Sequence, residues 1–185
     1  MRVRSLFLAI LVCLAGAVLA LASPQPGIWI DVPFVAQTMD GCGSASISMV
    51  MQYWASKTGL GVPDAADAGR IQKALVVPSQ NGIPASAMRG YFEKSGYRAF
   101  AFQGTWEDLV HHVKEGRPLI VSLRASAPSR ALHYVVVVGI DLERNDVFIH
   151  DPAQQKMLRI SRQGFESEWN PTHNWTLLAV PRSND

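Results

Sequence analysis

One short segment of this chain combines residue types that together can perform acyl-transfer chemistry. Gln37 lies five residues before Cys42, and a long apolar stretch of helical character begins at the cysteine. A cysteine at the amino end of a helix faces the positive end of the helix dipole, which favours thiolate over thiol. A glutamine amide just upstream can donate an N–H group where a negatively charged oxygen would form. This arrangement is typical of a cysteine hydrolase, provided that a histidine and an orienting acid or amide follow.

Two later residues meet that requirement. His133 opens a strand-like valine run, and Asp151 closes the next strand-like run. If these runs pair as an antiparallel hairpin, their outer ends meet at the same edge of a sheet, so His133 and Asp151 become neighbours in space. The sequence therefore predicts that His133 is the general base for Cys42 and that Asp151 orients its imidazole ring.

Each of these residues also has an ordinary structural explanation when it is taken alone. A cysteine near the start of a buried helix is most often a small core residue. Alone, His133 would be a strand-edge histidine and Gln37 an exposed loop residue. The pair Asp151-Pro152 is typical of a turn. The four residues in this order are much harder to obtain by accident, and we therefore take them together as the candidate catalytic site.

The first residues have the pattern of an export signal. Arg2 and Arg4 precede an almost unbroken apolar run at 6–20, and Ala20-Leu21-Ala22 provides a small-x-small cleavage site. The run is slightly short for a membrane span, which needs about 20 apolar residues. We expect residues 1–22 to be a signal peptide, with an uncleaved inner-membrane anchor as the alternative. The expected location is therefore periplasmic or extracellular.

Removal of residues 1–22 would leave residues 23–185, a length that suits one domain with its own core. Of the 17 basic residues, Arg2 and Arg4 would be lost, which leaves 15 basic and 15 acidic residues. No cluster of Lys and Arg remains, which argues against nucleic acid as the main partner. Cys42 would be the single cysteine of the exported chain. Exported proteins usually pair their cysteines or lack them, so a solitary thiol favours a nucleophile.

The elements that position the site follow from hydrophobic periodicity and from chain breakers. The stretch after Cys42 is apolar on nearly all faces, which indicates a buried central helix. A Ser/Pro loop at 125–131 is expected to rim a cleft. Expected helices lie at 43–56, 64–75, 85–95, 106–115 and 165–169, and expected strands at 28–32, 97–102, 119–123, 133–141, 147–150, 157–160 and 176–180. Helices come first and strands second, which predicts an α+β fold with an antiparallel sheet.

The remaining histidines do not suggest a metal site. His111 and His112 are adjacent on an expected helix, so they point to different sides and are expected at the surface. His150 directly precedes Asp151 on a strand and should face the opposite way. His173 lies in a Pro/Asn loop without a recognisable partner. The sequence also has no Gly-rich phosphate loop, so we expect neither a metal nor a cofactor.

These residues resemble the motifs of the C39-type peptidases, a branch of the papain-like superfamily. The resemblance spans about residues 28–180 and implies a papain-like fold with the nucleophile on a central helix. By this resemblance, Gln37 is the oxyanion residue and Cys42 the nucleophile, while His133 is the base and Asp151 its orienter. The matching segments are Val32-Pro33-Phe34, Asp40-Gly41-Cys42-Gly43-Ser44-Ala45-Ser46, His133-Tyr134-Val135-Val136-Val137, Asp151-Pro152-Ala153 and Phe165-Glu166-Ser167-Glu168-Trp169.

The best-known C39-type peptidases are N-terminal domains of ABC exporters that cleave leader peptides after a double glycine. This chain has no six-helix membrane domain and no ATPase motif, so an exporter would have to be a separate partner. The expected function is that of an exported cysteine peptidase acting on a peptide or protein. Two alternatives remain open: another amide hydrolase or acyltransferase on the same scaffold, and a catalytically silent peptide-binding module.

Overall fold

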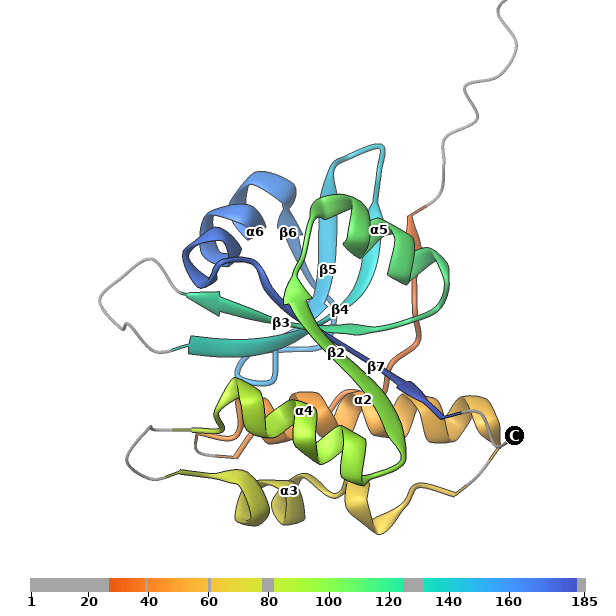
Figure 1. Ribbon diagram of the computed structural model, residues 1–185. Coiled ribbons are helices and arrows are strands. Elements are labelled where there is room, and N and C mark those ends of the chain that lie inside the picture. Colours follow the sequence, from red (N-terminus) through yellow and green to blue (C-terminus); the bar gives the residue numbers. More distant parts are fainter. Residues whose placement is uncertain (1–26, 39, 60, 78–81, 125–131, 183–185) are drawn as a thin grey trace, which may run out of the picture.

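The structure is a computed structural model that describes residues 27–38, 40–59, 61–77, 82–124 and 132–182 (Figure 1). The predicted signal peptide and the predicted loop at 125–131 lie outside the described residues. Within the described ranges, no helix is both long enough and apolar enough to cross a membrane.

The predicted central helix is present as α2 (Cys42–Thr58). Its first turn contains only small residues, so other segments approach it closely. A Cβ atom on Gly43 would lie 3.2 Å from the Ile83 side chain and 3.4 Å from the Tyr134 ring. The helix ends at Gly59, which has the left-handed conformation that terminates many helices. The cysteine is therefore the first residue of a helix that is buried along most of its length.

The single helix predicted at 64–75 is wrong, because the chain is interrupted there. A short 3₁₀ helix, η2 (Asp64–Ala66), is followed by α3 (Ala68–Leu75), and Asp67 between them has an extended backbone. The Asp67 carboxylate accepts a hydrogen bond of 2.7 Å from the Arg70 N–H group, which caps α3 and starts a new helix at this point. The break leaves Ala66 fully buried, with its carbonyl accepting a hydrogen bond of 2.6 Å from the Ser48 hydroxyl of α2.

The other helices follow the predictions closely. They are α4 (Ala85–Lys94), α5 (Trp106–Lys114) and α6 (Arg162–Trp169). Thr105 and Asp108 form a reciprocal capping box that starts α5. Helix α6 begins earlier than predicted because the Ser161 hydroxyl caps it, accepting from the Gly164 N–H group at 3.2 Å.

The strands form one antiparallel sheet with the order β2-β7-β3-β4-β5-β6, and β1 pairs with β4. Their bounds are β1 (Ile28–Trp29), β2 (Tyr97–Gln103), β3 (Leu119–Arg124), β4 (Leu132–Asp141), β5 (Asp146–His150), β6 (Leu158–Ser161) and β7 (Trp175–Pro181). Strand β1 is shorter than predicted because the Val32 N–H group turns back to the Ile30 carbonyl at 2.9 Å.

Helices cover the sheet, with α2, α3 and α4 on one side of it and α5 and α6 on the other (Figure 1). Strand β4 contacts α2 and α5, so it is enclosed by both groups of helices. Its valine run, 135–138, is fully buried, which explains why this strand is continuously apolar instead of alternating. The fold is therefore of the α+β class, with helices packed on an antiparallel sheet, as predicted.

Candidate active site

Cys42 is a free cysteine whose environment is set by the start of α2. The preceding residue, Gly41, makes no side-chain cap, and the first turn contains no acidic residue. The dipole of α2 therefore acts on the thiol without a nearby side-chain charge in that turn to oppose it. Gly41 is needed for the tight approach of the preceding loop, because a Cβ atom there would lie 3.0 Å from the Thr38 carbonyl oxygen.

His133 lies near the start of β4 and joins two of the predicted site residues. Its Nε2 atom is 2.7 Å from Oδ1 of Asp151, and its side chain also hydrogen-bonds the Cys42 thiol. Since Asp151 occupies Nε2, the nitrogen that remains for the sulfur is Nδ1. The structure thus brings Cys42, His133 and Asp151 into one hydrogen-bonded row.

The carboxylate of Asp151 is held firmly in the turn that follows β5. It is 3% exposed, and Oδ1 also accepts a hydrogen bond of 2.9 Å from the Ala153 N–H group. Its other oxygen accepts from the Gln154 side-chain amide. Burial raises the pKa of Asp151. The hydrogen bond and the charge of His133 outweigh this effect, together with the hydrogen bonds from Ala153 and Gln154, so the pKa is lowered overall. The carboxylate therefore stays ionised opposite the imidazole.

The pKa values of the thiol and the imidazole move in opposite directions. Burial raises the pKa of Cys42, but hydrogen bonds from His133 and from the Tyr134 and Gly43 N–H groups outweigh it, so the pKa is lowered. Burial lowers the pKa of His133, but its hydrogen bonds to Asp151 and Cys42 raise it to about 9. These shifts favour a thiolate beside an imidazolium near neutral pH.

Gln37 is tied to the same turn as Asp151. Its backbone N–H group donates a hydrogen bond of 2.9 Å to the carbonyl of Pro152, the residue directly after Asp151. Its side-chain Oε1 atom is buried and has no hydrogen-bond partner among the described residues. One turn thus fixes both the Asp151 carboxylate and the segment that carries Gln37.

A family model described as the Peptidase_C39 like family matches residues 29–176. This chain belongs to that family. The match includes Gln37, Cys42, His133 and Asp151 and extends from β1 into β7. Among curated proteins, no sequence matches the chain at a significant level.

Solved structures of C39-like peptidases share the fold of this family member. A candidate C39-like peptidase from Bacillus anthracis is 20% identical, with a TM-score of 0.63, and the match covers 86% of this chain and 100% of that one. The peptidase domain of Streptococcus ComA, a bi-functional ABC transporter, is 23% identical over 80% of this chain and 98% of that one, with a TM-score of 0.62. A double glycine motif protease from an AMS/PCAT transporter, solved with the leader peptide, is 21% identical, with a TM-score of 0.62. The match covers 83% of this chain and 94% of that one.

His150 is a further residue of this C39-like site that sequence reasoning left without a role. It is fully buried, and its hydrogen-bond partners differ from those of Asp151. Its Nε2 atom is 2.9 Å from the Val32 carbonyl, and its Nδ1 atom accepts from the Met157 N–H group at 3.1 Å. These two bonds require the neutral ring with its proton on Nε2. His150 therefore fastens the segment leading to Gln37 to the end of β5. In the sequence, the only indication of this role was that a histidine directly precedes the predicted site residue Asp151.

We expect His150 to make the fold sensitive to mild acid. Burial lowers its pKa in the folded chain, whereas in the unfolded chain it takes up a proton near its ordinary pKa of about 6.5. The unfolded state then binds more protons, so stability should fall as the pH drops below about 6.5, by up to about 1.4 kcal/mol per pH unit. Urea unfolding at a series of pH values between neutral and mildly acidic would measure this loss.

His150→Gln is the matched variant, since a glutamine amide can offer one donor and one acceptor but does not titrate. Its stability should fall less over the same pH range. Equal falls in the two proteins would contradict the assignment. Titration of His133 does not affect this comparison. Its raised pKa contributes to the stability of the fold, and this contribution is complete below about pH 6.5 and is lost only as the pH rises through about 9.

The other histidines are not part of the hydrogen-bonded row of Cys42, His133 and Asp151. His111 is exposed, whereas His112, predicted at the surface, is half-buried beside Phe102, with ring centroids 6.3 Å apart. His173 follows a 3₁₀ turn, η4 (Asn170–Thr172), in a left-handed conformation. In the part of the chain that the structure describes, no group of three or more His, Cys, Asp or Glu side chains could hold a metal ion.

Proposed function

We propose that this C39-like protein is a cysteine peptidase in which Cys42 is the nucleophile, His133 the acid–base residue and Asp151 its orienting partner. The observation that carries the proposal is the hydrogen-bonded row of these three residues, with the pKa of the thiol lowered and that of the imidazole raised. Such a pair holds a nucleophilic sulfur next to a proton donor before any substrate arrives.

In the first half of the reaction, the Cys42 sulfur attacks the carbonyl carbon of a peptide bond. The carbonyl oxygen becomes negatively charged, and the N–H group of Cys42 and the side-chain amide of Gln37 donate hydrogen bonds to it. The imidazolium of His133 then gives its proton to the leaving amine, and the C–N bond breaks. The products of this half are a free amine and a thioester on Cys42.

In the second half, neutral His133 takes a proton from water, and the resulting hydroxide attacks the thioester. The C–S bond breaks, the carboxylic acid leaves, and the thiolate–imidazolium pair is restored. Throughout both halves, Asp151 keeps the ring in one orientation and stabilises its positive charge. This chemistry uses only groups of the chain and needs no cofactor.

We propose a peptide or protein as the substrate. One of the structures with the same fold, the double glycine motif protease, was solved with a leader peptide, which supports a peptide as the substrate here. The test is a peptide-library digest with the purified chain, read by mass spectrometry. We expect defined cleavage sites that disappear when Cys42 is blocked with iodoacetamide. Acyl transfer to added amines without hydrolysis would favour an acyltransferase, and no reaction would favour a binding module.

We also propose that the protein is exported, on the basis of the basic start, the apolar run at 6–20 and the small residues at its end. N-terminal sequencing of protein from its native host is expected to begin at or near Ser23 in the periplasmic or extracellular fraction. An intact Met1 in the membrane fraction would instead support an anchor. Soluble cytoplasmic protein that retains Met1 would contradict export.

A further inference from the structure

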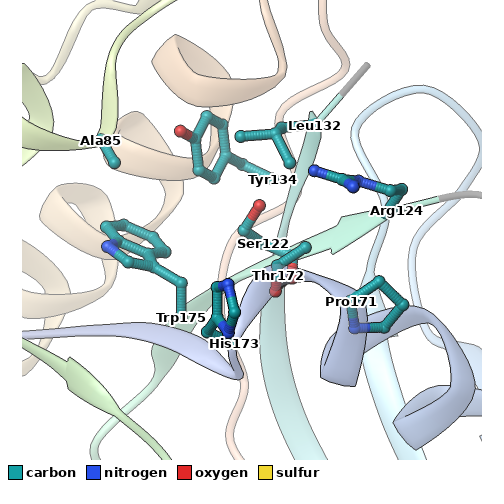
Figure 2. Close-up of a pocket in the computed structure, with 9 residues that line it drawn as sticks. All are labelled: Ala85, Ser122, Arg124, Leu132, Tyr134, Pro171, Thr172, His173 and Trp175. Atoms are coloured by element: carbon teal, nitrogen blue, oxygen red, sulfur yellow. Dashed lines mark hydrogen bonds between the residues drawn. The ribbon is translucent and has the colours of Figure 1, made fainter. Parts of the chain in front are cut away.

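A cavity of about 290 Å³ lies next to the segment of β4 that carries His133, and Figure 2 shows the residues that line it. Its walls come from β3, β4 and β7, from the turn after α6, and from Ala85 at the start of α4. The cavity therefore lies on the sheet beside the start of α4. Pockets for whole drug-sized ligands usually measure about 300–1,000 Å³, so this cavity has the size for one large side chain rather than for a long peptide segment.

One residue that lines the cavity, Tyr134, also contacts the Cys42 sulfur through its backbone. Leu132 and Tyr134, which line the cavity, are the residues on either side of His133 in β4. The backbone of Tyr134 hydrogen-bonds the Cys42 thiol, and its ring packs beside Gly43 in the first turn of α2. A peptide whose carbonyl carbon reaches the sulfur therefore has a neighbouring side chain within reach of this cavity.

Two of the nine residues that line the cavity, Tyr134 and Trp175, carry large aromatic rings. The Tyr134 and Trp175 rings meet edge to face, with centroids 5.5 Å apart, and Ala85, which also lines the cavity, is small. Arg124 and His173 line the cavity as well, and among the described residues no carboxylate does so. Aromatic walls favour a flat apolar side chain, and the nearby guanidinium disfavours a lysine or arginine.

Ser122 adds a hydrogen-bonding group that nothing in the described chain uses. It lies opposite Tyr134 in the pairing of β3 with β4 and is 2% exposed. Its hydroxyl has no hydrogen-bond partner among the described residues. Figure 2 shows Ser122 between Tyr134 and Thr172, with its oxygen directed among the lining side chains. A buried hydroxyl without a partner can form its missing hydrogen bond when a ligand brings a polar atom within reach.

We propose that this cavity is a specificity subsite that receives a tyrosine side chain of the substrate, with the phenol oxygen hydrogen-bonded to the Ser122 hydroxyl. The proposal rests on the proposed peptidase function and adds the substrate class. Phenylalanine would fill the same space but leave Ser122 unpaired. Glycine and alanine would leave the cavity empty, and an aliphatic side chain would match its aromatic walls less well.

The experiment uses peptides that are identical except at one residue, in a glycine and alanine background. Tyrosine, phenylalanine, leucine, lysine or glycine is placed in turn at each position around the cleaved bond, and kcat/KM is measured for each. At one position, we expect tyrosine to exceed glycine at least about ten-fold and phenylalanine by several-fold, since a site that hydrogen-bonds a hydroxyl discriminates against its absence.

Two variants test the cavity itself. Ser122→Ala should lower the tyrosine rate to that of phenylalanine and leave the phenylalanine rate unchanged, because it removes only the hydroxyl. Ala85→Phe should fill the space from the helical side and remove the preference for either aromatic residue over glycine. Ser167→Ala, which removes an exposed hydroxyl of α6, is the control and should alter none of these ratios.

Iodoacetamide labelling of Cys42 is a second readout that does not depend on the cavity, because the reagent is too small to need it. Its rate should be the same in all three variants, which also reports a correctly folded site. Cleavage without any tyrosine preference, or equal effects of Ser122→Ala on tyrosine and phenylalanine, overturns the subsite alone. Failure to cleave any peptide while Cys42 still reacts overturns the peptidase function together with the subsite.

Discussion

Replacement of Cys42 by alanine is expected to abolish peptide hydrolysis, lowering kcat/KM on the order of 10⁴-fold or more. The sulfur is the atom that forms the thioester, and no other group in the described site can take over the attack. The fold should be retained, because α2 starts with small residues and the cysteine side chain is only partly buried. The measurement is the initial rate on a peptide identified in the library digest, with urea unfolding as the check on folding.

Cys42→Ser is the matched control, since it keeps the shape and a polar atom but replaces an acidic thiol by a hydroxyl. Its hydrolysis should also be lost, while its affinity for the substrate peptide should remain. If either variant retained more than a few per cent of the natural rate, Cys42 would not be the nucleophile, and the proposed function would fail with it.

Replacement of His133 by alanine is expected to cause two large effects. Hydrolysis should fall on the order of 10³-fold or more, since both the proton donor and the later base are removed. The reactivity of the thiol should also change its dependence on pH. In the natural sequence, hydrogen bonding from His133 helps to lower the pKa of Cys42, so alkylation should extend to lower pH than it does for an ordinary cysteine. In His133→Ala, alkylation should require the thiolate of an ordinary cysteine, with a pKa of about 8.5.

The measurement is the alkylation rate of the Cys42 peptide followed by mass spectrometry across the pH range. The natural protein should show a second change near the point at which His133 loses its proton, since its pKa is raised to about 9. Asp151→Asn is a graded control, because an amide oxygen can still accept from Nε2 of His133 but supplies no charge. It should give a weaker enzyme with an intermediate profile. Coinciding profiles for the natural protein and His133→Ala would show that His133 is not the partner of Cys42.

The hairpin that joins His133 to Asp151 illustrates what the sequence could predict and what it could not. Two β-rich runs joined by a short turn were sufficient to predict that the outer ends of β4 and β5 meet. The pairing register was not predictable. It shifts by one residue at a bulge, so that Asp141 pairs with Asp146 but Val136 pairs with His150. A one-residue shift moves side chains to the opposite face of a sheet, and bulges carry no distinctive sequence signal in a valine run.

Most of the other elements could be predicted from interactions between residues that are close together in the chain. The small residues and apolar side chains after Cys42 predicted a buried helix, and α2 begins at that cysteine. The cap of α5 is formed by residues within one turn of the helix start, and such short-range hydrogen bonds leave a pattern in the sequence. The Ser161 cap of α6 was missed, so that helix was predicted to begin too late. The error at 64–75 has the same origin, because Asp67 is a helix cap that was interpreted as an interior residue.

The sequence by itself thus determined the chemical types in the site, the order of the elements and the class of fold. Only the tertiary structure decided that Gln37 is tied to Pro152, that His150 fastens Val32 and Met157, and that Ser122 is buried beside the Tyr134 and Trp175 rings. The physical reason is the range of the interactions. Helix caps and periodicity join residues within a few positions, whereas these contacts join segments that meet only after the whole sheet has closed.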